Sequence, residues 1–252
     1  MTQQQRQALI LEKIQQSGFV TIDELVKHFK VTPQTVRRDL NQLAKVKKIS
    51  RYHGGAGTES STVNTDYQTR KIMDLEAKEK IAADLVNMIP DGASIFINIG
   101  TTTETIARAL LEHKGLQIVT NNLNVASILG AKEDFSVVIA GVEVRHRDGG
   151  VIGETTEEFI KKFRMDFGII GISGIDLEGS LLDFDYREVR VAQAIIANSR
   201  QVLLAADHSK FGRNAMVRLG NINQADHFFT DATPPAEIQQ ILSDHRVTLH
   251  LT

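Results

Sequence analysis

The chain has 252 residues, of which 42% are hydrophobic and 24% are charged, enough for one large domain or two smaller ones with a buried core. It contains no cysteine, which excludes disulfides, thiolate metal sites and cysteine nucleophiles. No uncharged apolar stretch approaches the ~20 residues of a membrane-spanning helix and the N-terminus lacks a signal-peptide core, so the sequence predicts a soluble, cytoplasmic protein without a membrane partner.

The net charge of −2 is unevenly distributed along the chain. Residues 1–58 hold ten Lys or Arg and four Asp or Glu, a net charge of +6, whereas the remaining residues hold 19 and 27, a net charge of −8. A basic segment at the start of an acidic chain is typical of a domain that binds a polyanion, although a solvated charged surface produces the same pattern.

The first 45 residues predict three short helices. Residues 7–16 carry apolar side chains at helical spacing. Thr21 and Glu24 have the spacing of a capping box at the start of a second helix. Thr32 can cap a third helix, with Pro33 at its first position.

The third predicted helix, residues 33–45, separates apolar from polar side chains. At about 100° per residue, Val36, Leu40 and Leu43 share one face. The opposite side carries Gln34, Arg37, Arg38, Asn41 and Lys45. Gln, Arg and Asn suit base edges, and Lys suits phosphates. An ordinary amphipathic surface helix has the same pattern, but the capped helix and the four-residue turn before it favour a helix-turn-helix with 33–45 as the recognition helix.

Residues 46–57, the run VKKISRYHGGAG, predict a β-hairpin wing that can contact phosphate or an adjacent groove. His53 also suits a spacer role. The residues expected to contact DNA are Thr21, Thr32, Gln34, Thr35, Arg37, Arg38, Asn41, Lys45, Lys47, Lys48, Arg51 and His53.

The basic segment resembles the winged helix-turn-helix of the DeoR family of bacterial repressors. The resemblance lies in residues 21–29 and in the runs VTPQTVRRDLNQL and RYHGGA, and it covers the segment without gaps. It implies that the activity is repression of transcription and that the partner is double-stranded operator DNA.

The rest of the chain alternates apolar runs with helical stretches after a small polar linker. We predict a DNA-binding domain at 1–57, a linker at 58–74 and an α/β domain at 75–252. Apolar strands interleaved with amphipathic helices indicate a mainly parallel sheet covered on both faces. The predicted strand runs are 94–100, 117–121, 135–141, 167–173, 201–207, 227–231 and 247–251.

Ligands of such sheets bind beyond the carboxyl ends of the strands, where four segments of this chain are polar or glycine-rich. Residues 98–103 precede a helix, so their amides and hydroxyls can receive a phosphate. Residues 119–122 can bind sugar hydroxyls, residues 206–212 supply Asp207 and Lys210, and residues 141–150 form a flexible loop with two arginines. An ordinary strand exit or surface turn also explains each segment by itself.

These segments resemble the sugar-phosphate-sensing domain of the DeoR family, whose fold is related to ribose-5-phosphate isomerases and CoA transferases. The resemblance lies in the runs EAKEKIA, IGTTTETIA, VTNN, DFGIIGISGI and ADHSKFG. Asn98 replaces an aspartate common in the family, and Val142 stands where a second glycine is usual. The resemblance implies that Gly100, Thr101 and Thr102 hold the effector phosphate, with Lys78, Asp207 and Lys210 nearby. Together with Asn98, Thr103 and Asn121 from the polar strand ends, these are the residues that we expect to contact the effector.

The resemblance implies a repressor released from its operator by a small phosphorylated polyol or sugar. Glycerol 3-phosphate is the expected effector, and a DeoR-type repressor that senses another sugar phosphate is one alternative. The other alternative is a sugar-phosphate isomerase or transferase with a DNA-binding head, for which Asp183, Asp185, Glu188 and Asp207 are possible bases. We expect no catalytic site and no cofactor. We also expect no metal site, because the histidines are scattered along the chain. One head reads too few base pairs for a unique site, so we expect a homo-oligomer, either a dimer or a tetramer.

Overall fold

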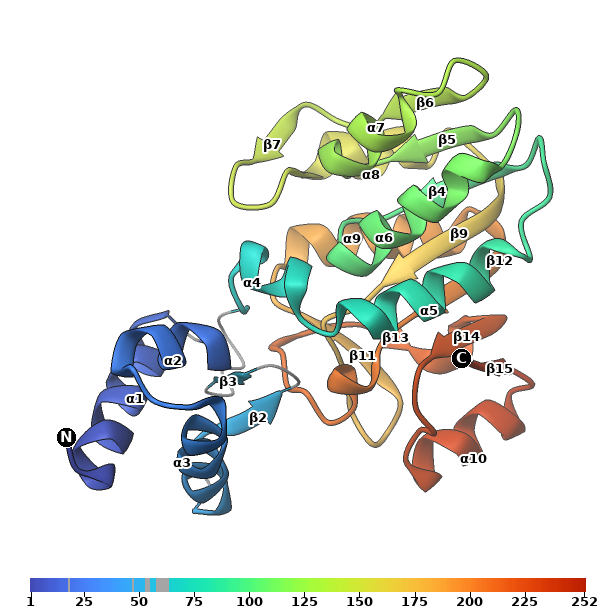
Figure 1. The fold of residues 1–252 in the computed structure, drawn as a ribbon. Helices are drawn as coiled ribbons and strands as arrows, with labels where there is room; N and C mark the ends of the chain where they lie inside the picture. Colours follow the sequence, from blue (N-terminus) through green and yellow to red (C-terminus); the bar gives the residue numbers. More distant parts are fainter. Residues whose placement is uncertain (18, 47, 53–54, 58–63) are drawn as a thin grey trace. The chain divides into compact units, whose positions relative to one another are not determined.

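The computed structural model describes residues 1–17, 19–46, 48–52, 55–57 and 64–252 (Figure 1). The chain forms two compact units, Met1–Asp74 and Leu75–Thr252. No helix in these ranges is long and apolar enough to cross a membrane.

The first unit packs three helices against a small antiparallel sheet. The helices are α1 (Gln3–Ser17), α2 (Ile22–Phe29) and α3 (Pro33–Lys45). The strands β1 (Phe19–Thr21), β2 (Ser50–Tyr52) and β3 (Gly55–Gly57) lie in the order β1-β3-β2. The apolar positions at helical spacing, including Ile10, Leu25 and Leu40, form a single buried core. The three predicted helices and the predicted wing hairpin are confirmed.

Local capping sets where α2 and α3 begin. The Thr21 hydroxyl accepts from the backbone N of Glu24 at 3.1 Å, and a Glu24 carboxylate oxygen accepts from the Thr21 backbone N at 2.8 Å. The Thr32 hydroxyl accepts from the Thr35 backbone N at 3.2 Å, and Pro33 opens the helix. The predicted capping box is therefore present.

A short helix that the sequence analysis did not predict, α4 (Tyr67–Ile72), lies within the 58–74 segment. The Asp66 carboxylate begins it by accepting from the backbone N of Gln68 at 2.9 Å and of Thr69 at 3.3 Å. One aspartate cap followed by fewer than two helical turns leaves too little periodicity to recognise in a sequence.

The second unit is built on a seven-stranded sheet in which all six neighbouring pairs are parallel. Its order is β15-β14-β12-β9-β4-β5-β6. The seven strand runs predicted from apolar content all belong to it, which confirms the mainly parallel sheet. The strands are β4 (Ser94–Ile97), β5 (Gln117–Thr120), β6 (Ser136–Ile139), β9 (Met165–Gly171), β12 (Ser199–Ala205), β14 (His227–Thr230) and β15 (Thr248–Leu251).

Helices cover both faces of this sheet (Figure 1). A hydrophobic core lies on each face, and alternate residues of a strand point into opposite cores. Ile95 and Ile97 pack in one core with α5 (Leu75–Val86), α6 (Thr101–Ala109) and α7 (Leu123–Leu129). Phe96, between them, packs in the other core with α8 (Glu154–Ile160), α9 (Tyr186–Ala197) and α10 (Ala236–Asp244). The 3-10 turns are η1 (Leu110–Glu112), η2 (His208–Lys210) and η3 (Ile222–Gln224).

Five further strands lie outside the main sheet. The strands β10 (Gly174–Ile175), β11 (Ser180–Asp183) and β13 (Val217–Asn221) pair antiparallel. The strands β7 (Glu143–Arg145) and β8 (Gly150–Ile152) form a hairpin. The sequence analysis predicted a flexible loop at 141–150 instead of this hairpin. The hairpin is held in place because Arg145 pairs with Asp185 and Glu188 at the start of α9, which are 40 and 43 residues further along the chain.

Candidate DNA interface and ligand site

The exposed face of α3 carries the polar residues that its spacing predicted. Gln34, Arg37, Arg38, Asn41 and Lys45 are all exposed. Val36, Leu40 and Leu43 are buried in the core of the first unit. The helix thus presents amide and guanidinium groups, the side chains suited to base edges.

Two expected DNA contacts, Thr21 and Thr32, act as helix caps. Each hydroxyl accepts from the backbone three residues ahead, and the Thr32 hydroxyl also lies 2.9 Å from that of Thr35. Their contact with DNA stays a prediction. Lys48 is exposed, whereas Lys47 and His53 fall outside the described residues.

Arg37 of α3 and Arg51 of β2 form a positive pair. Burial lowers the pKa of the Arg51 guanidinium, and the positive charge of Arg37 lowers it further. In the part of the chain that the structure describes, Nη1 of Arg51 is buried and has no hydrogen-bond partner. Two cations that repel each other favour an anion between them, and a DNA phosphate has the required charge.

The sequence analysis missed the contacts that hold α3 against α1. Nε of Arg6 donates to Oδ2 of Asp39, and both side chains are buried. Nε2 of Gln3 donates to Oδ1 of Asp39 at 2.8 Å, and Nε2 of Gln7 donates to Oε1 of Gln42 at 2.7 Å. The available signal was that an aspartate occupies a position near the core side of an otherwise amphipathic helix.

In the second unit, the chain leaves β4 through Asn98 and Gly100 and enters α6. Gly100 has φ 156°, a conformation that residues with a side chain rarely adopt. The first amides of α6 have no hydrogen-bond acceptor within the helix, so they can donate to an anion. The Thr103 hydroxyl donates to the carbonyls of Asn98 and Gly100, each at 2.8 Å, and so stabilises the loop, and its contact with an effector stays a prediction.

The Asn98 side chain bridges β4 and β9. Its Nδ2 donates to the Gly171 carbonyl at 3.0 Å, and its Oδ1 accepts from the Gly171 backbone N at 2.8 Å. Both functional groups are therefore engaged by the backbone, and contact of Asn98 with an effector stays a prediction. The second departure from the family pattern, Val142, is 80% exposed and does not have a positive φ, so nothing here requires glycine.

Asp207, after β12, is buried among cations. Lys210 Nζ lies 3.4 Å from its Oδ2, and the Ser209 backbone N donates to its Oδ1 at 3.0 Å. Burial opposes ionisation, but Lys210, Ser209 and the charge of Lys78 outweigh it and lower the pKa of Asp207 to about 2. Lys78 of α5 is itself only 2% exposed.

Asn121 and Asn122 follow β5. The Asn121 Nδ2 donates to the Val151 carbonyl at 3.0 Å, whereas its Oδ1 is buried and accepts no hydrogen bond from any described residue. Asn122 caps α7, and its Nδ2 lies 3.4 Å from Oε1 of the buried Glu104.

The sheet order brings these segments together. The strands β12, β9, β4 and β5 are consecutive neighbours and run parallel. Their carboxyl ends therefore share one edge of the sheet, where Gly171 ends β9 and where Asp207, Gly100 and Asn121 follow the other three strands. Helix amides and lysines at this edge can hold a phosphate, and amide or carboxylate oxygens can accept from hydroxyls.

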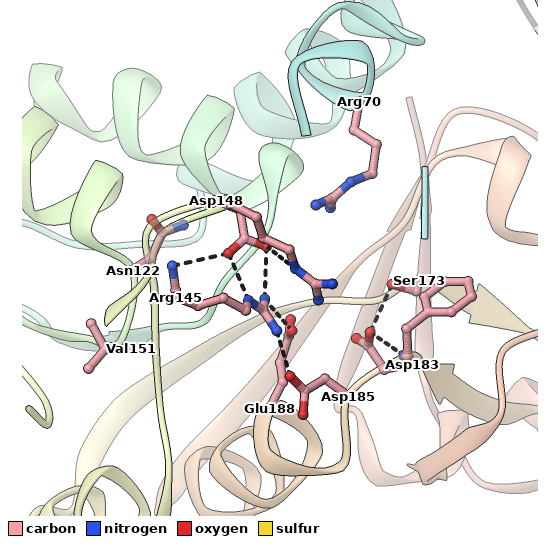
Figure 2. A network of polar contacts seen from close by, with 12 residues as sticks. Arg70, Asn122, Arg145, Asp148, Val151, Ser173, Asp183, Asp185 and Glu188 are labelled. Carbon is pink, nitrogen blue, oxygen red and sulfur yellow. Dashed lines mark hydrogen bonds and ion pairs between the residues drawn. The ribbon is translucent and has the colours of Figure 1, made fainter. Parts of the chain in front are cut away.

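Two of the possible bases, Asp185 and Glu188, contact Arg145, and the charge of a third, Asp183, acts on Glu188 (Figure 2). The guanidinium contacts Asp185 at 3.0 Å and Glu188 at 2.7 Å, and it also pairs with Asp148. Burial, and then the charge of Asp183, raise the pKa of Glu188 to about 8 despite Arg145. Asp183 accepts from the Ser173 hydroxyl at 3.0 Å and from the Phe184 backbone N at 2.7 Å. The sequence analysis did not identify this network.

Comparisons with known proteins match both units. The model of the DeoR-like helix-turn-helix domain matches residues 6–62, and that of the DeoR C terminal sensor domain matches residues 73–232. The chain is 57% identical over 251 residues to the glycerol-3-phosphate regulon repressor of Escherichia coli (strain K12), covering 100% of both chains. It is 53% identical over 234 residues to the repressor of the same name from Haemophilus influenzae, covering 93% of this chain and 91% of that one. The solved structure of ribose 5-phosphate isomerase A from Neisseria gonorrhoeae is similar over 53% of this chain and 52% of that one, with a TM-score of 0.40 and 17% identity.

Proposed function

This chain belongs to the DeoR family of helix-turn-helix regulators, and we propose that it represses genes of glycerol 3-phosphate metabolism and is released from its operator by glycerol 3-phosphate. The observation that carries the proposal is the 57% identity, over the whole length of both chains, to a glycerol-3-phosphate regulon repressor. The chain is accordingly a regulator and not an enzyme, and it would act in the cytoplasm, where bacterial DNA lies.

The geometry of the first unit supports the DNA-binding half of the proposal. The exposed face of α3 would enter the major groove, with Arg38 and Asn41 contacting base edges. Arg37 and Arg51 would hold a backbone phosphate between them. A single head of this kind buries only ~600–1,000 Å² on DNA, so a dimer or tetramer on a roughly palindromic operator would supply the remaining affinity and specificity.

The edge of the sheet supports the effector half of the proposal. The free amides at the start of α6, with Thr101 and Thr102, would bind the phosphate of glycerol 3-phosphate, and Lys210 would neutralise its charge. Asn121 and Asp207 would accept from its hydroxyls. The effector would then favour a conformation with lower DNA affinity, so operator DNA would weaken effector binding by the same factor.

The proposal is tested by selecting bound fragments from genomic DNA and titrating the complex with small phosphates. We expect fluorescence anisotropy to show release by glycerol 3-phosphate and not by glycerol or inorganic phosphate at equal concentration. Release by a different sugar phosphate alone would contradict the proposed effector and leave the repressor assignment intact. Failure to enrich any DNA would contradict the DNA-binding role itself.

A further inference from the structure

The β7–β8 hairpin is joined to the end of β5 through its backbone. The Val151 backbone N donates to the Asn121 carbonyl at 2.7 Å, and the Leu123 backbone N donates to the Gly149 carbonyl at 2.9 Å. The Val151 carbonyl, in turn, accepts from Nδ2 of Asn121. The hairpin therefore sets the direction of the Asn121 amide, and with it the direction of Oδ1, the acceptor that no described residue satisfies.

The same hairpin is joined to the start of α9 through one guanidinium (Figure 2). Arg145 donates to both carboxylate oxygens of Asp148 at 2.8 Å, to Asp185 at 3.0 Å and to Glu188 at 2.7 Å. Its side chain is only 9% exposed. Asp148 belongs to the hairpin, whereas Asp185 caps α9 and Glu188 lies in its first turn.

Charge makes Arg145 necessary for this contact. The carboxylates of Asp148 and Asp185 and the carboxyl group of Glu188 surround a single buried cation, so without it Asp148 would face Asp185 across the junction. Burial alone would lower the pKa of Arg145, but Glu188 and Asp148 outweigh it and raise that pKa, so the guanidinium stays charged. The arginines at the rim of the cluster, Arg147 and Arg187, are about half exposed and contact only one of these carboxylates each.

The hairpin also packs closely against residues 98–100, the loop between β4 and α6 that is proposed to bind the phosphate. A Cβ on Gly150 would lie 2.6 Å from Cδ1 of Ile99 and 3.3 Å from Nη2 of Arg145. Ile99 stands between Asn98 and Gly100. The hairpin backbone therefore fits between this loop and the guanidinium, and a shift of the hairpin would move Asn121 relative to the loop.

We propose that Arg145 is a positioning residue of the effector site: by tying the β7–β8 hairpin to α9, it directs Oδ1 of Asn121 toward a hydroxyl of the bound effector. Arg145 touches no effector atom in this arrangement. It determines specificity for the hydroxyl-bearing end of the ligand, while the Gly100 loop and Lys210 bind the phosphate. The inference rests on the proposed function, because it needs an effector that carries both groups.

Arg145→Lys tests the inference, because lysine keeps the charge but cannot join three carboxylates with a planar fork. Calorimetry should show that glycerol 3-phosphate binds about tenfold more weakly, as expected for one lost hydrogen bond. Inorganic phosphate, titrated by NMR, should bind as it does to the unsubstituted protein. Asn121→Ala should have the same selective effect, and the double variant should lose no more than either single one.

Arg190→Lys is the matched control, because Arg190 joins the same helix to Glu154 and Glu157 of α8 and not to Asp148 of the hairpin. It should leave both affinities unchanged. If Arg145→Lys does not fold, Asp148→Asn removes one charge of the same ion pair with little change of shape, and a smaller loss of the same selective kind is expected.

Unchanged affinity for glycerol 3-phosphate in Arg145→Lys or Asp148→Asn would overturn the inference, and so would an equal loss of glycerol 3-phosphate and inorganic phosphate. If the unsubstituted protein does not bind glycerol 3-phosphate, the proposed function fails as well. Binding of glycerol 3-phosphate to the unsubstituted protein therefore distinguishes failure of this inference from failure of the proposed function.

Discussion

Asn98 and Gly171 form a closed pair of hydrogen bonds across β4 and β9, with the Asn98 amide donating at 3.0 Å and accepting at 2.8 Å. An amide can do both, whereas an ionised aspartate has no hydrogen to donate. The pair holds two central strands together directly beside the loop proposed to bind phosphate.

Asn98→Asp should therefore destabilise the second unit. At neutral pH a carboxylate oxygen would face the Gly171 carbonyl, and an unsatisfied buried contact of this kind costs about 1–3 kcal/mol. A protonated carboxyl can donate, so the deficit should shrink as the pH falls toward 4. Urea unfolding at both pH values measures this, with Asn87→Asp at an exposed position as the control. Equal stability of Asn98→Asp and the unsubstituted protein at neutral pH would contradict it.

Arg38→Ala should lower operator affinity by about 1–3 kcal/mol and relax the preference for one base pair, because Arg38 lies on the exposed face of α3. Lys48→Ala is the comparison: it should weaken binding to all sequences and reduce the salt slope by about one unit. Anisotropy on operator and scrambled DNA at several salt concentrations separates the two. Equal losses on both DNAs in Arg38→Ala would remove Arg38 from base recognition.

Lys210→Ala and Thr101→Val should each produce a repressor that binds its operator normally but is not released by glycerol 3-phosphate. Each removes a hydrogen bond that we propose the side chain donates to the phosphate, and a charge-assisted bond of this kind contributes about 1.5–3 kcal/mol, or roughly tenfold or more in affinity. Gel-shift titrations against effector concentration measure the release. If the surface turn and helix cap were their only roles, release would occur at the unsubstituted midpoint.

Glu188 should make stability fall as the pH rises. Its pKa in the folded protein is raised to about 8, above its ordinary value of 4.5, so the folded state binds the proton more tightly than the unfolded chain. This contribution is complete below the ordinary pKa and is lost as the pH rises through about 8. Glu188→Gln has no proton to lose, so its stability relative to the unsubstituted protein should increase between pH 5 and pH 8. Thermal unfolding of both proteins between pH 5 and pH 8 measures this difference. If their stabilities change with pH in the same way, the pKa of Glu188 is not raised in the folded protein.

The features that could be predicted from the sequence depend on neighbouring residues. The Thr21–Glu24 capping box lies within one helical turn, and the strands of the parallel sheet are continuous apolar runs. Apart from the short helix α4, the features that were missed join distant positions. Arg6 and Asp39 are 33 residues apart, Arg145 and Glu188 are 43, and Asn98 and Gly171 are 73. A single sequence shows that such polar residues need partners when buried, but only the packed sheet and helices determine which partners they meet.

The anchoring of α3 bears on how its DNA specificity can be changed. Asp39 and Gln42 hold the helix to Arg6, Gln3 and Gln7 of α1, which prevents it from turning about its own axis. Gln34, Arg38 and Asn41 take no part in these contacts, so they can be exchanged without loosening the helix. Redesign of the preferred operator can therefore vary these three positions in a combinatorial library while keeping Asp39, Gln42 and the whole of α1 constant.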